Sequence, residues 1–95
     1  MPAQTTTVPA FALTEHARLR MSQRGIRQTD IGTVLRLGRC RRTRGARFYF
    51  VGRKEVRRYA GQGLDLRGVE NLQVLLDPHS DAVITVYRSA RLPRG

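Results

Sequence analysis

The order of apolar and polar positions predicts two short helices at the start of the chain. Thr14 is a favourable helix N-cap and Gly25 can end a helix after Arg24, so the first helix is expected from about Thr14 to Arg24. Thr29 can cap a second helix, which carries apolar residues at positions 31, 34 and 35. Gly38 is expected to end it.

Beyond the second helix the pattern changes to period two, which is typical of strands. Phe48 and Phe50 would share one face, with the apolar positions 49 and 51 on the other. The segment Arg39 to Ala60 therefore predicts two or three antiparallel strands, of which the third is the run Glu55 to Ala60. The segment Gly61 to Gly68 contains three glycines and is expected to be a loop.

The two most apolar segments are Val69 to Asp77 and Ala82 to Arg88, separated by turn-forming residues at positions 77–81. We expect both to be central strands. Two helices followed by a run of strands is an α+β pattern. The sequence therefore predicts two N-terminal helices packed on one face of a four- to five-stranded antiparallel sheet.

The length of 95 residues suits one domain, expected at residues 11–90. Residues 1–10 are rich in Thr and Pro without periodicity and are expected to form a flexible tail, and residues 91–95 a short C-terminal tail. No apolar run is long enough to span a membrane, and residues 1–10 do not resemble a secretory signal. We expect a cytoplasmic protein without a membrane partner.

Charge is the first unusual feature of the composition. Lys and Arg number 18 against 7 Asp and Glu, which gives a formal net charge of +11. Lys54 is the only lysine, and a GC-rich genome would explain arginine in place of lysine but not the shortage of acids. The charge balance predicts a polyanionic partner, and RNA is the one we expect.

Ten basic residues lie between positions 36 and 58, opposed only by Glu55, and aromatic residues are interleaved with them. Arginine can bind phosphates and aromatic rings can stack on unpaired bases, so this segment predicts an RNA-binding hairpin. The alternative is an edge hairpin whose charges prevent aggregation. The expected RNA contacts are Arg39, Arg41, Arg42, Arg44, Arg47, Tyr49, Arg57 and Arg58.

On the first helix, His16, Arg20 and Arg24 are spaced four apart and form one row. The apolar positions 13, 17 and 21 lie directly alongside it, so the row borders the buried face. There a side chain can be partly desolvated and still reach a ligand. The alternative is that these residues only pack on the rim of the core.

In the last strand, alternation places Thr85 and Tyr87 on one face with Val83, and Arg88 on the other face. A threonine, a tyrosine and an arginine are suitable phosphate donors, and the tyrosine ring could stack on a base. The alternative is that Thr85 and Tyr87 simply suit a strand. We see no carboxylate pair and no cluster of metal ligands, and with the single Cys40 no disulfide, so no metal or cofactor is expected.

Four short segments together resemble a known family: Leu13-Thr14-Glu15-His16-Ala17 with Arg20, Arg24-Gly25-Ile26, Asp30-Ile31, and Val83-Ile84-Thr85-Val86-Tyr87-Arg88. The chain is similar, from residue 14 to 88, to a widespread family of small uncharacterised bacterial proteins placed near the RelE-like toxins. Their broad group contains barnase, EndoU and the tRNase colicins. The resemblance implies a RelE/barnase-like fold with a metal-independent RNA-cleaving site. Carried onto this sequence, its residues are His16, Arg20, Arg24, Thr85, Tyr87 and Arg88.

The first hypothesis is a toxin-like endoribonuclease in which a ribose 2′-hydroxyl attacks the neighbouring phosphate. His16 would be the base or acid. Three arginines (Arg20, Arg24 and Arg88) would stabilise the dianionic transition state. Thr85 would orient a phosphate oxygen, and Tyr87 would stack on a base or transfer the second proton. The substrate would be RNA, either free, on the ribosome or as tRNA.

Two other hypotheses remain open at this point. The first is a non-catalytic nucleic-acid-binding module that uses the hairpin between Arg39 and Arg58, with His16 in a structural role. The second is an interaction protein whose basic face binds an acidic antitoxin or immunity protein.

Overall fold

The computed structural model describes residues 11–91. The tails expected at 1–10 and 91–95 lie outside this range, apart from residue 91. The fold is α+β, as the sequence predicts. In chain order its elements are β1 (Ala12–Leu13), α1 (Glu15–Arg24), α2 (Gln28–Leu37), β2 (Arg39–Thr43), β3 (Ala46–Phe50), α3 (Arg53–Ala60), the 3-10 helix η1 (Arg67–Val69), β4 (Leu72–Leu76) and β5 (Ala82–Arg88).

Helix α1 begins and ends at the predicted residues. The Thr14 side chain accepts a hydrogen bond from the backbone N–H of Ala17 at 3.1 Å, which satisfies one of the free donors of the first turn. Gly25 ends the helix in the left-handed region, with φ of 64°. Thr14 Oγ1 also donates to the carbonyl of Ile84 at 3.1 Å, so the same cap ties α1 to β5.

Helix α2 ends before Gly38 as predicted, but the predicted N-cap Thr29 is wrong. The N-cap is Arg27, whose backbone N–H donates to Asp30 Oδ2 at 2.9 Å. An acid at the third helical position that reaches back to the cap starts the helix two residues earlier. Thr29 lies in the first turn, where its carbonyl accepts a hydrogen bond from Thr33 Oγ1 at 2.9 Å.

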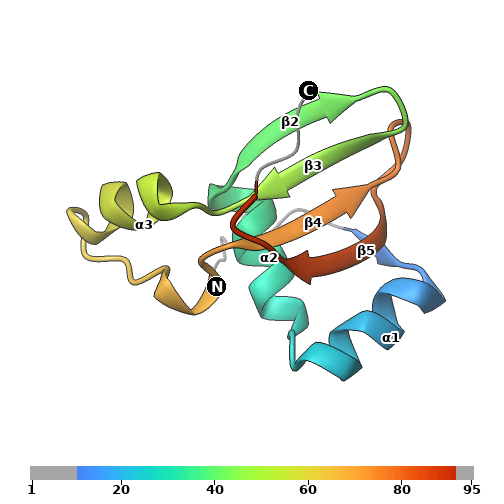
Figure 1. Ribbon diagram of the computed structural model, residues 1–95, viewed down its shortest axis with the longest axis horizontal. Helices are drawn as coiled ribbons and strands as arrows, with labels where there is room; N and C mark the ends of the chain where they lie inside the picture. Colours follow the sequence, from blue (N-terminus) through green and yellow to red (C-terminus); the bar gives the residue numbers. More distant parts are fainter. Residues whose placement is uncertain (1–10, 92–95) are drawn as a thin grey trace, which may run out of the picture.

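The sheet has five strands in the order β1-β5-β4-β3-β2 (Figure 1). Four strands form an antiparallel meander, with β4 and β5 inside the sheet as predicted. The expectation of a purely antiparallel sheet is wrong, because the two-residue β1 pairs with β5 in parallel. Phe11–Leu13 are too few for periodicity to reveal a strand.

Helix α3 replaces the strand expected at Glu55 to Ala60. Glu55 Oε1 accepts the backbone N–H of Gly52 at 2.8 Å and so begins the helix. The half-buried Val56 and Tyr59 are three residues apart, a helical rather than a strand spacing. The 3-10 helix η1 spans the end of the predicted loop and the first residue of the strand predicted from Val69, so β4 begins only at Leu72, and η1 brings Val69 into the core.

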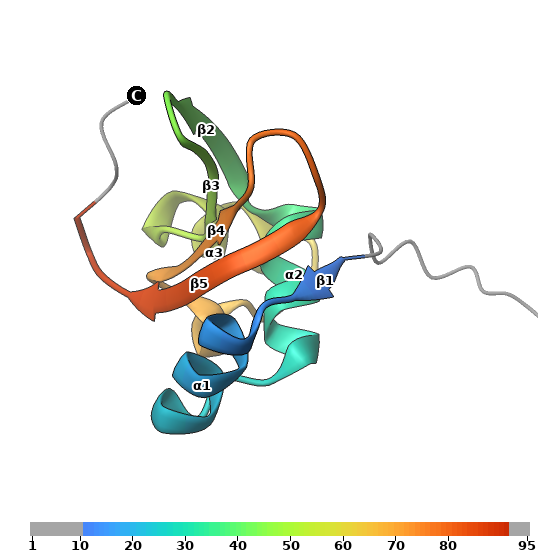
Figure 2. The ribbon, with the colours of Figure 1, turned by 90° about the vertical axis from the view of Figure 1, so that its right-hand side faces the viewer.

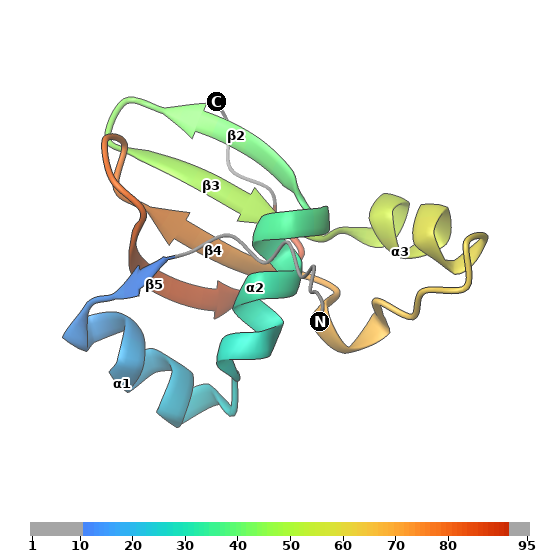
Figure 3. The ribbon, with the colours of Figure 1, turned by 180° about the vertical axis from the view of Figure 1, so that it is seen from behind.

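One hydrophobic core joins α1 and α2 to the sheet. Figure 2 shows α2 on one side of the sheet, and Figure 3 shows it crossing β3 and β4, while α1 lies along β5. None of the helices within residues 11–91 is long and apolar enough to cross a membrane. The buried core residues are Ala17, Ile26, Ile31, Val34, Val51, Leu66, Val69, Leu72, Val74, Leu76, Val83 and Val86.

Gly38 lies where α2 meets the end of β3. A Cβ there would lie 2.5 Å from the carbonyl oxygen of Val34 and 2.6 Å from that of Phe50, closer than real Cβ contacts. Both obstructing atoms belong to the backbone, so neither can swing away. The junction between helix and sheet therefore requires a residue without a side chain.

Gly38→Ala should lower the free energy of unfolding by about 1–3 kcal/mol, because the added methyl forces the backbone apart. Gly45→Ala is the matched control, since a Cβ at Gly45 meets nothing within 4 Å. Urea unfolding of both variants measures the difference. Equal stability of the two would contradict this account of the junction.

Candidate nucleic-acid interface

The two faces of the sheet differ in what covers them. Tyr49, Val74 and Val86 share a face, because 49 pairs with 74 and 74 with 86, and all three pack in the core with the helices. We call this the covered face. Alternation sends the neighbouring side chains to the opposite side, which no helix overlies in Figure 1. We call that side the open face.

The open face carries two rows of side chains across four strands. The first row runs Arg41, Phe48, Leu75 and Thr85, each paired with the next. The second row is built in the same way from Arg39, Phe50, Gln73 and Tyr87. Neighbouring strands lie about 4.8 Å apart, so each row is roughly 15 Å long. Each row therefore has an arginine at one end and a threonine or a tyrosine at the other. The central strip between them consists of Phe48, Phe50, Gln73 and Leu75.

The first row is the accessible one. Arg41 is exposed, while Phe48, Leu75 and Thr85 are half-buried, so part of each side chain can meet a ligand. Such a row combines a planar cation, an aromatic ring and a hydroxyl at cross-strand spacing. It can hold a phosphate at its basic end and a flat ring against Phe48.

The second row is partly covered by the chain itself. The Gln73 amide Nε2 donates to the carbonyls of Ser89 at 3.1 Å and of Arg91, which holds the stretch after β5 over the open face. In Figure 2 this stretch leaves β5 on the side away from α2. Gln73 and Phe50 are consequently buried. Tyr87 remains half-buried, and burial raises the pKa of its phenol.

Arg39 fixes one corner of the second row. Its Nε lies 2.6 Å from Glu55 Oε2, and its guanidinium carbon lies 4.8 Å from the centroid of the Phe50 ring. Glu55 is a buried residue of α3, so its carboxylate holds the Arg39 guanidinium in place from inside the protein. Arg39 is therefore a fixed cation that stacks on a ring, whereas Arg41 is free to follow a ligand.

A β-bulge in β5 places Val83 on a different face of the sheet from Thr85 and Tyr87. The register shifts between Leu75, which pairs with Thr85, and Leu76, which pairs with Val83. Ile84 is the extra residue, so Val83 is on the covered face although sequence alternation placed it with Thr85. Thr85 and Tyr87 keep a common face, and that face is the open one.

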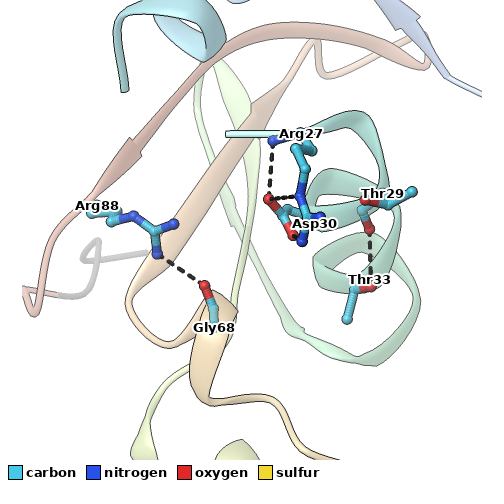
Figure 4. Close-up of polar contacts among 6 residues, drawn as sticks. All are labelled: Arg27, Thr29, Asp30, Thr33, Gly68 and Arg88. Carbon is cyan, nitrogen blue, oxygen red and sulfur yellow. Dashed lines mark hydrogen bonds and ion pairs between the residues drawn. The ribbon is translucent and has the colours of Figure 1, made fainter. Parts of the chain in front are cut away.

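Arg88 lies on the other side of β5. It pairs with the core residue Leu72, and its Nη1 donates to the carbonyl of Gly68 at 3.3 Å. Figure 4 shows this guanidinium turned toward Gly68, near the start of α2, where Arg27 binds Asp30. The structure thus separates Arg88 from Thr85 and Tyr87, although the three are almost consecutive.

The predicted row on α1 is present at the edge of the sheet. Arg20 Nε donates to His16 Nε2 at 3.4 Å, and Arg20 Nη1 donates to the amide oxygen of Gln23 at 3.4 Å. His16 and Arg24 are exposed, whereas the neighbouring Ala17 is fully buried. Within residues 11–91, no hydrogen bond joins this row to the polar residues of β5.

The predicted RNA contacts fall into three groups. Arg41 is on the open face with Arg39, and Arg44 lies at the tip of the β2–β3 turn. By alternation along β2 and β3, the side chains of Arg42, Arg47 and Tyr49 belong to the covered face. Arg57 and Arg58 are exposed on α3, beyond the end of the sheet (Figure 3).

Besides Arg39, two more members of the predicted set are engaged inside the protein. Arg47 donates to the carbonyls of Asp77 at 3.3 Å and Ser80 at 2.6 Å, and pairs with Asp81, so it braces the β4–β5 turn. Tyr49 packs against the core, where burial first and a hydrogen bond with Cys40 second raise its pKa. Neither side chain is available to the open face.

The two rows also contain four residues that the sequence reasoning did not select as site residues, namely Phe48, Phe50, Gln73 and Leu75. Phe48 could not be separated from Tyr49 by sequence alone, because whether the face of the two phenylalanines or the face of Tyr49 is covered depends on where the helices pack. Gln73 is the only polar residue in the apolar strand β4, and that contrast was a usable signal. Within residues 11–91 no group of three His, Cys, Asp or Glu side chains is arranged to hold a metal ion.

Comparison with known proteins gives one match. A search of curated proteins and a search of solved structures each found none. The model of one protein family matches residues 13–88, which extend from the end of β1 to the end of β5 and include both rows of the open face. The chain belongs to the family described as Domain of unknown function (DUF4258).

Proposed function

We propose that this chain binds single-stranded RNA on the open face. The observation that carries the proposal is the accessible row of Arg41, Phe48, Leu75 and Thr85 on the side of the sheet that no helix covers. Unpaired bases present a flat face that a ring can stack on, while a duplex buries its bases. The net charge of +11 attracts the polyanion before these contacts form.

The order of residues along the row suggests how a strand lies. Arg41 and the exposed Arg44 at the turn would contact phosphates, Phe48 would stack on a base, and the hydroxyl of Thr85 would bind a second phosphate or a ribose. The phenol of Tyr87 is protonated at neutral pH, as tyrosine ordinarily is, and burial raises its pKa further, so it would donate a hydrogen bond.

Exchange of one ring for an aliphatic side chain tests which face binds. Phe48→Leu should weaken binding of an unpaired RNA about 5- to 150-fold, the scale of one lost stacking contact. Tyr49→Leu is the matched control, since the adjacent ring lies on the covered face and should leave affinity unchanged. Fluorescence anisotropy measures both. A larger loss for Tyr49→Leu would overturn the assignment of the face.

Charge removal tests the path of the backbone. Replacement of Arg41 and Arg44 by Gln should reduce the slope of log affinity against log salt by up to about 1.4, since each phosphate contact with a single strand contributes about 0.7. The matched control replaces the exposed Arg18 and Arg36, on α1 and α2. If both double variants change the slope equally, the attraction is general and the row is not the binding site.

A second candidate function is cleavage of the bound RNA, and the hydrogen bond from Arg20 to His16 favours it. Arg20 Nε donates to His16 Nε2, so an imidazole and a cation that can bind phosphate lie side by side, and Nε2 would take a proton once the guanidinium turns to the phosphate. At 100° per residue, this pair lies on one side of the buried Ala17, and Met21, which packs on the core, lies on the other side. We infer that this flank faces the rim of the open face, beside β5.

The reaction would be internal transfer without a metal, as in the RelE-like and barnase-like ribonucleases that the sequence resembles. His16 would take the proton of a ribose 2′-hydroxyl, whose oxygen attacks the adjacent phosphorus. The bond to the 5′-oxygen breaks, which leaves a 2′,3′-cyclic phosphate and a 5′-hydroxyl that receives a proton from Tyr87. Arg20 and Arg24 would stabilise the charge on the phosphate. Arg88 lies on the other side of β5, so we give it no role in this step.

His16→Ala should slow cleavage by about 10²- to 10⁴-fold with little change in RNA affinity, because a proton-transfer group acts mainly in the transition state. His79→Ala is the matched control, since this second histidine is exposed in the β4–β5 turn. Gel analysis of products and their termini measures the rates. If wild-type protein cuts no RNA, with or without ribosomes, the chain is a binding module; if His16→Ala cuts at the wild-type rate, another residue is the base.

A further inference from the structure

Helix α3 carries a cationic surface that the open face does not use. Arg53, Lys54, Arg57 and Arg58 are all exposed, and at 100° per residue they occupy one arc of about 140°. Arg53 approaches Glu70 at 3.9 Å, with its side chain 75% exposed. Within the described part of the chain, the other three form no ion pair. An eight-residue helix thus presents four positive charges to solvent.

The opposite side of α3 is occupied by the protein itself. Val56 and Tyr59 pack on the core, and Glu55 is buried against Arg39 while it caps the helix at Gly52. These contacts turn the cationic arc outward, together with the exposed Ala60 at the end of the helix. An amphipathic helix that lies on a membrane needs a free apolar face. In α3 that face is already used, which argues against a lipid surface as the ligand.

The position of α3 relates it to the open face. Only Val51 and Gly52 separate the end of β3 from the start of α3. In Figure 1, which looks onto the open face, α3 lies beyond the end of the sheet, on the side away from α1. Nucleic acid that leaves the open face at this end would therefore meet the cationic arc.

The chemistry of the arc selects the kind of nucleic acid. It has no aromatic side chain, because Tyr59 is turned to the core, so it lacks the rings that favour stacking on unpaired bases. It offers only cations for phosphates. A duplex hides its bases and displays closely spaced phosphates, and proteins recognise double-stranded RNA by shape and backbone contacts. The arc thus suits a duplex, whereas the open face suits an unpaired strand.

We propose that α3 binds the phosphate backbone of an RNA duplex, so that the preferred ligand is an unpaired segment next to a stem. This inference rests on the proposed function for the unpaired part of the ligand only. Joining two contacts on one ligand makes the second one intramolecular, which raises affinity without any new interaction.

Three RNA probes test the inference: an unpaired tail, a stem, and the same stem carrying that tail. Wild-type protein should bind the stem-tail RNA roughly tenfold or more tightly than the tail alone. Replacement of Lys54 and Arg58 by Gln should remove this gain and lower the salt slope for the stem-tail RNA by up to about 1.8, at 0.9 per duplex phosphate.

Two controls separate charge in α3 from general effects. The charge-preserving Lys54→Arg, Arg58→Lys variant should keep the gain, and the Arg18, Arg36→Gln variant should also keep it. Both α3 side chains are exposed and outside any ion pair within residues 11–91, so the fold should survive, which thermal unfolding checks.

The outcomes distinguish the two proposals. If the tail binds but the stem adds nothing, or if the Lys54, Arg58→Gln variant keeps the gain, the inference for α3 fails and binding on the open face stands. If the tail does not bind while the stem does, and the variant loses the stem, the open-face proposal fails and α3 stands. The inference for α3 is also overturned if the Lys54, Arg58→Gln variant loses affinity for phosphatidylserine vesicles while its affinity for each RNA is unchanged.

Discussion

The arrangement of the molecule depends on burial of a single face of the sheet. The helices that supply apolar stripes, α1 and α2, both precede the four-stranded meander in the chain, and their buried residues join one core with the covered face. Val74, Val83 and Val86 are buried in that core. The alternate side chains of the same strands point to the open face, which no helix covers. The stretch at 89–91 covers only the second row. A face with cations and rings thus remains open, because within residues 11–91 α1 and α2 pack on the other face and α3 lies beyond the end of the sheet.

The ion pair between Arg39 and Glu55 connects the open face to α3. Glu55 accepts the backbone N–H of Gly52 with one carboxylate oxygen and binds Arg39 with the other, so one buried residue begins the helix and orients a cation over Phe50. Breaking a buried pair leaves the remaining charge uncompensated, which costs more than the pair contributes. The Arg39–Glu55 ion pair therefore connects the two surfaces that we assign to RNA. The cationic arc of α3 faces solvent because the apolar side of the helix packs on the core.

Sequence patterns predicted the elements with local signals and missed those that depend on packing. Thr14 and Gly25 define α1 by their own capping chemistry, and β5 shows plain strand residues, so both were predicted correctly. Helix α3 also has a local signal, since Glu55 reaches back three residues to Gly52, and the prediction of a strand at Glu55 to Ala60 overlooked it. Of the candidate site, the common face of Thr85 and Tyr87 was predictable, whereas the bulge at Ile84 that moves Val83 to the core was not. The engagement of Arg47 with the β4–β5 turn is a long-range contact that no local pattern shows.

The central claim is that RNA meets the open face. Amide chemical-shift mapping during titration with an unpaired RNA tests it most directly, because it reports every strand and helix in one experiment. The account predicts the largest shifts at Arg41, Phe48, Leu75 and Thr85, with α2 unaffected. If the largest shifts instead fall on the outer side of α2, around Thr29 and Arg36, and the first row does not move, the claim is contradicted.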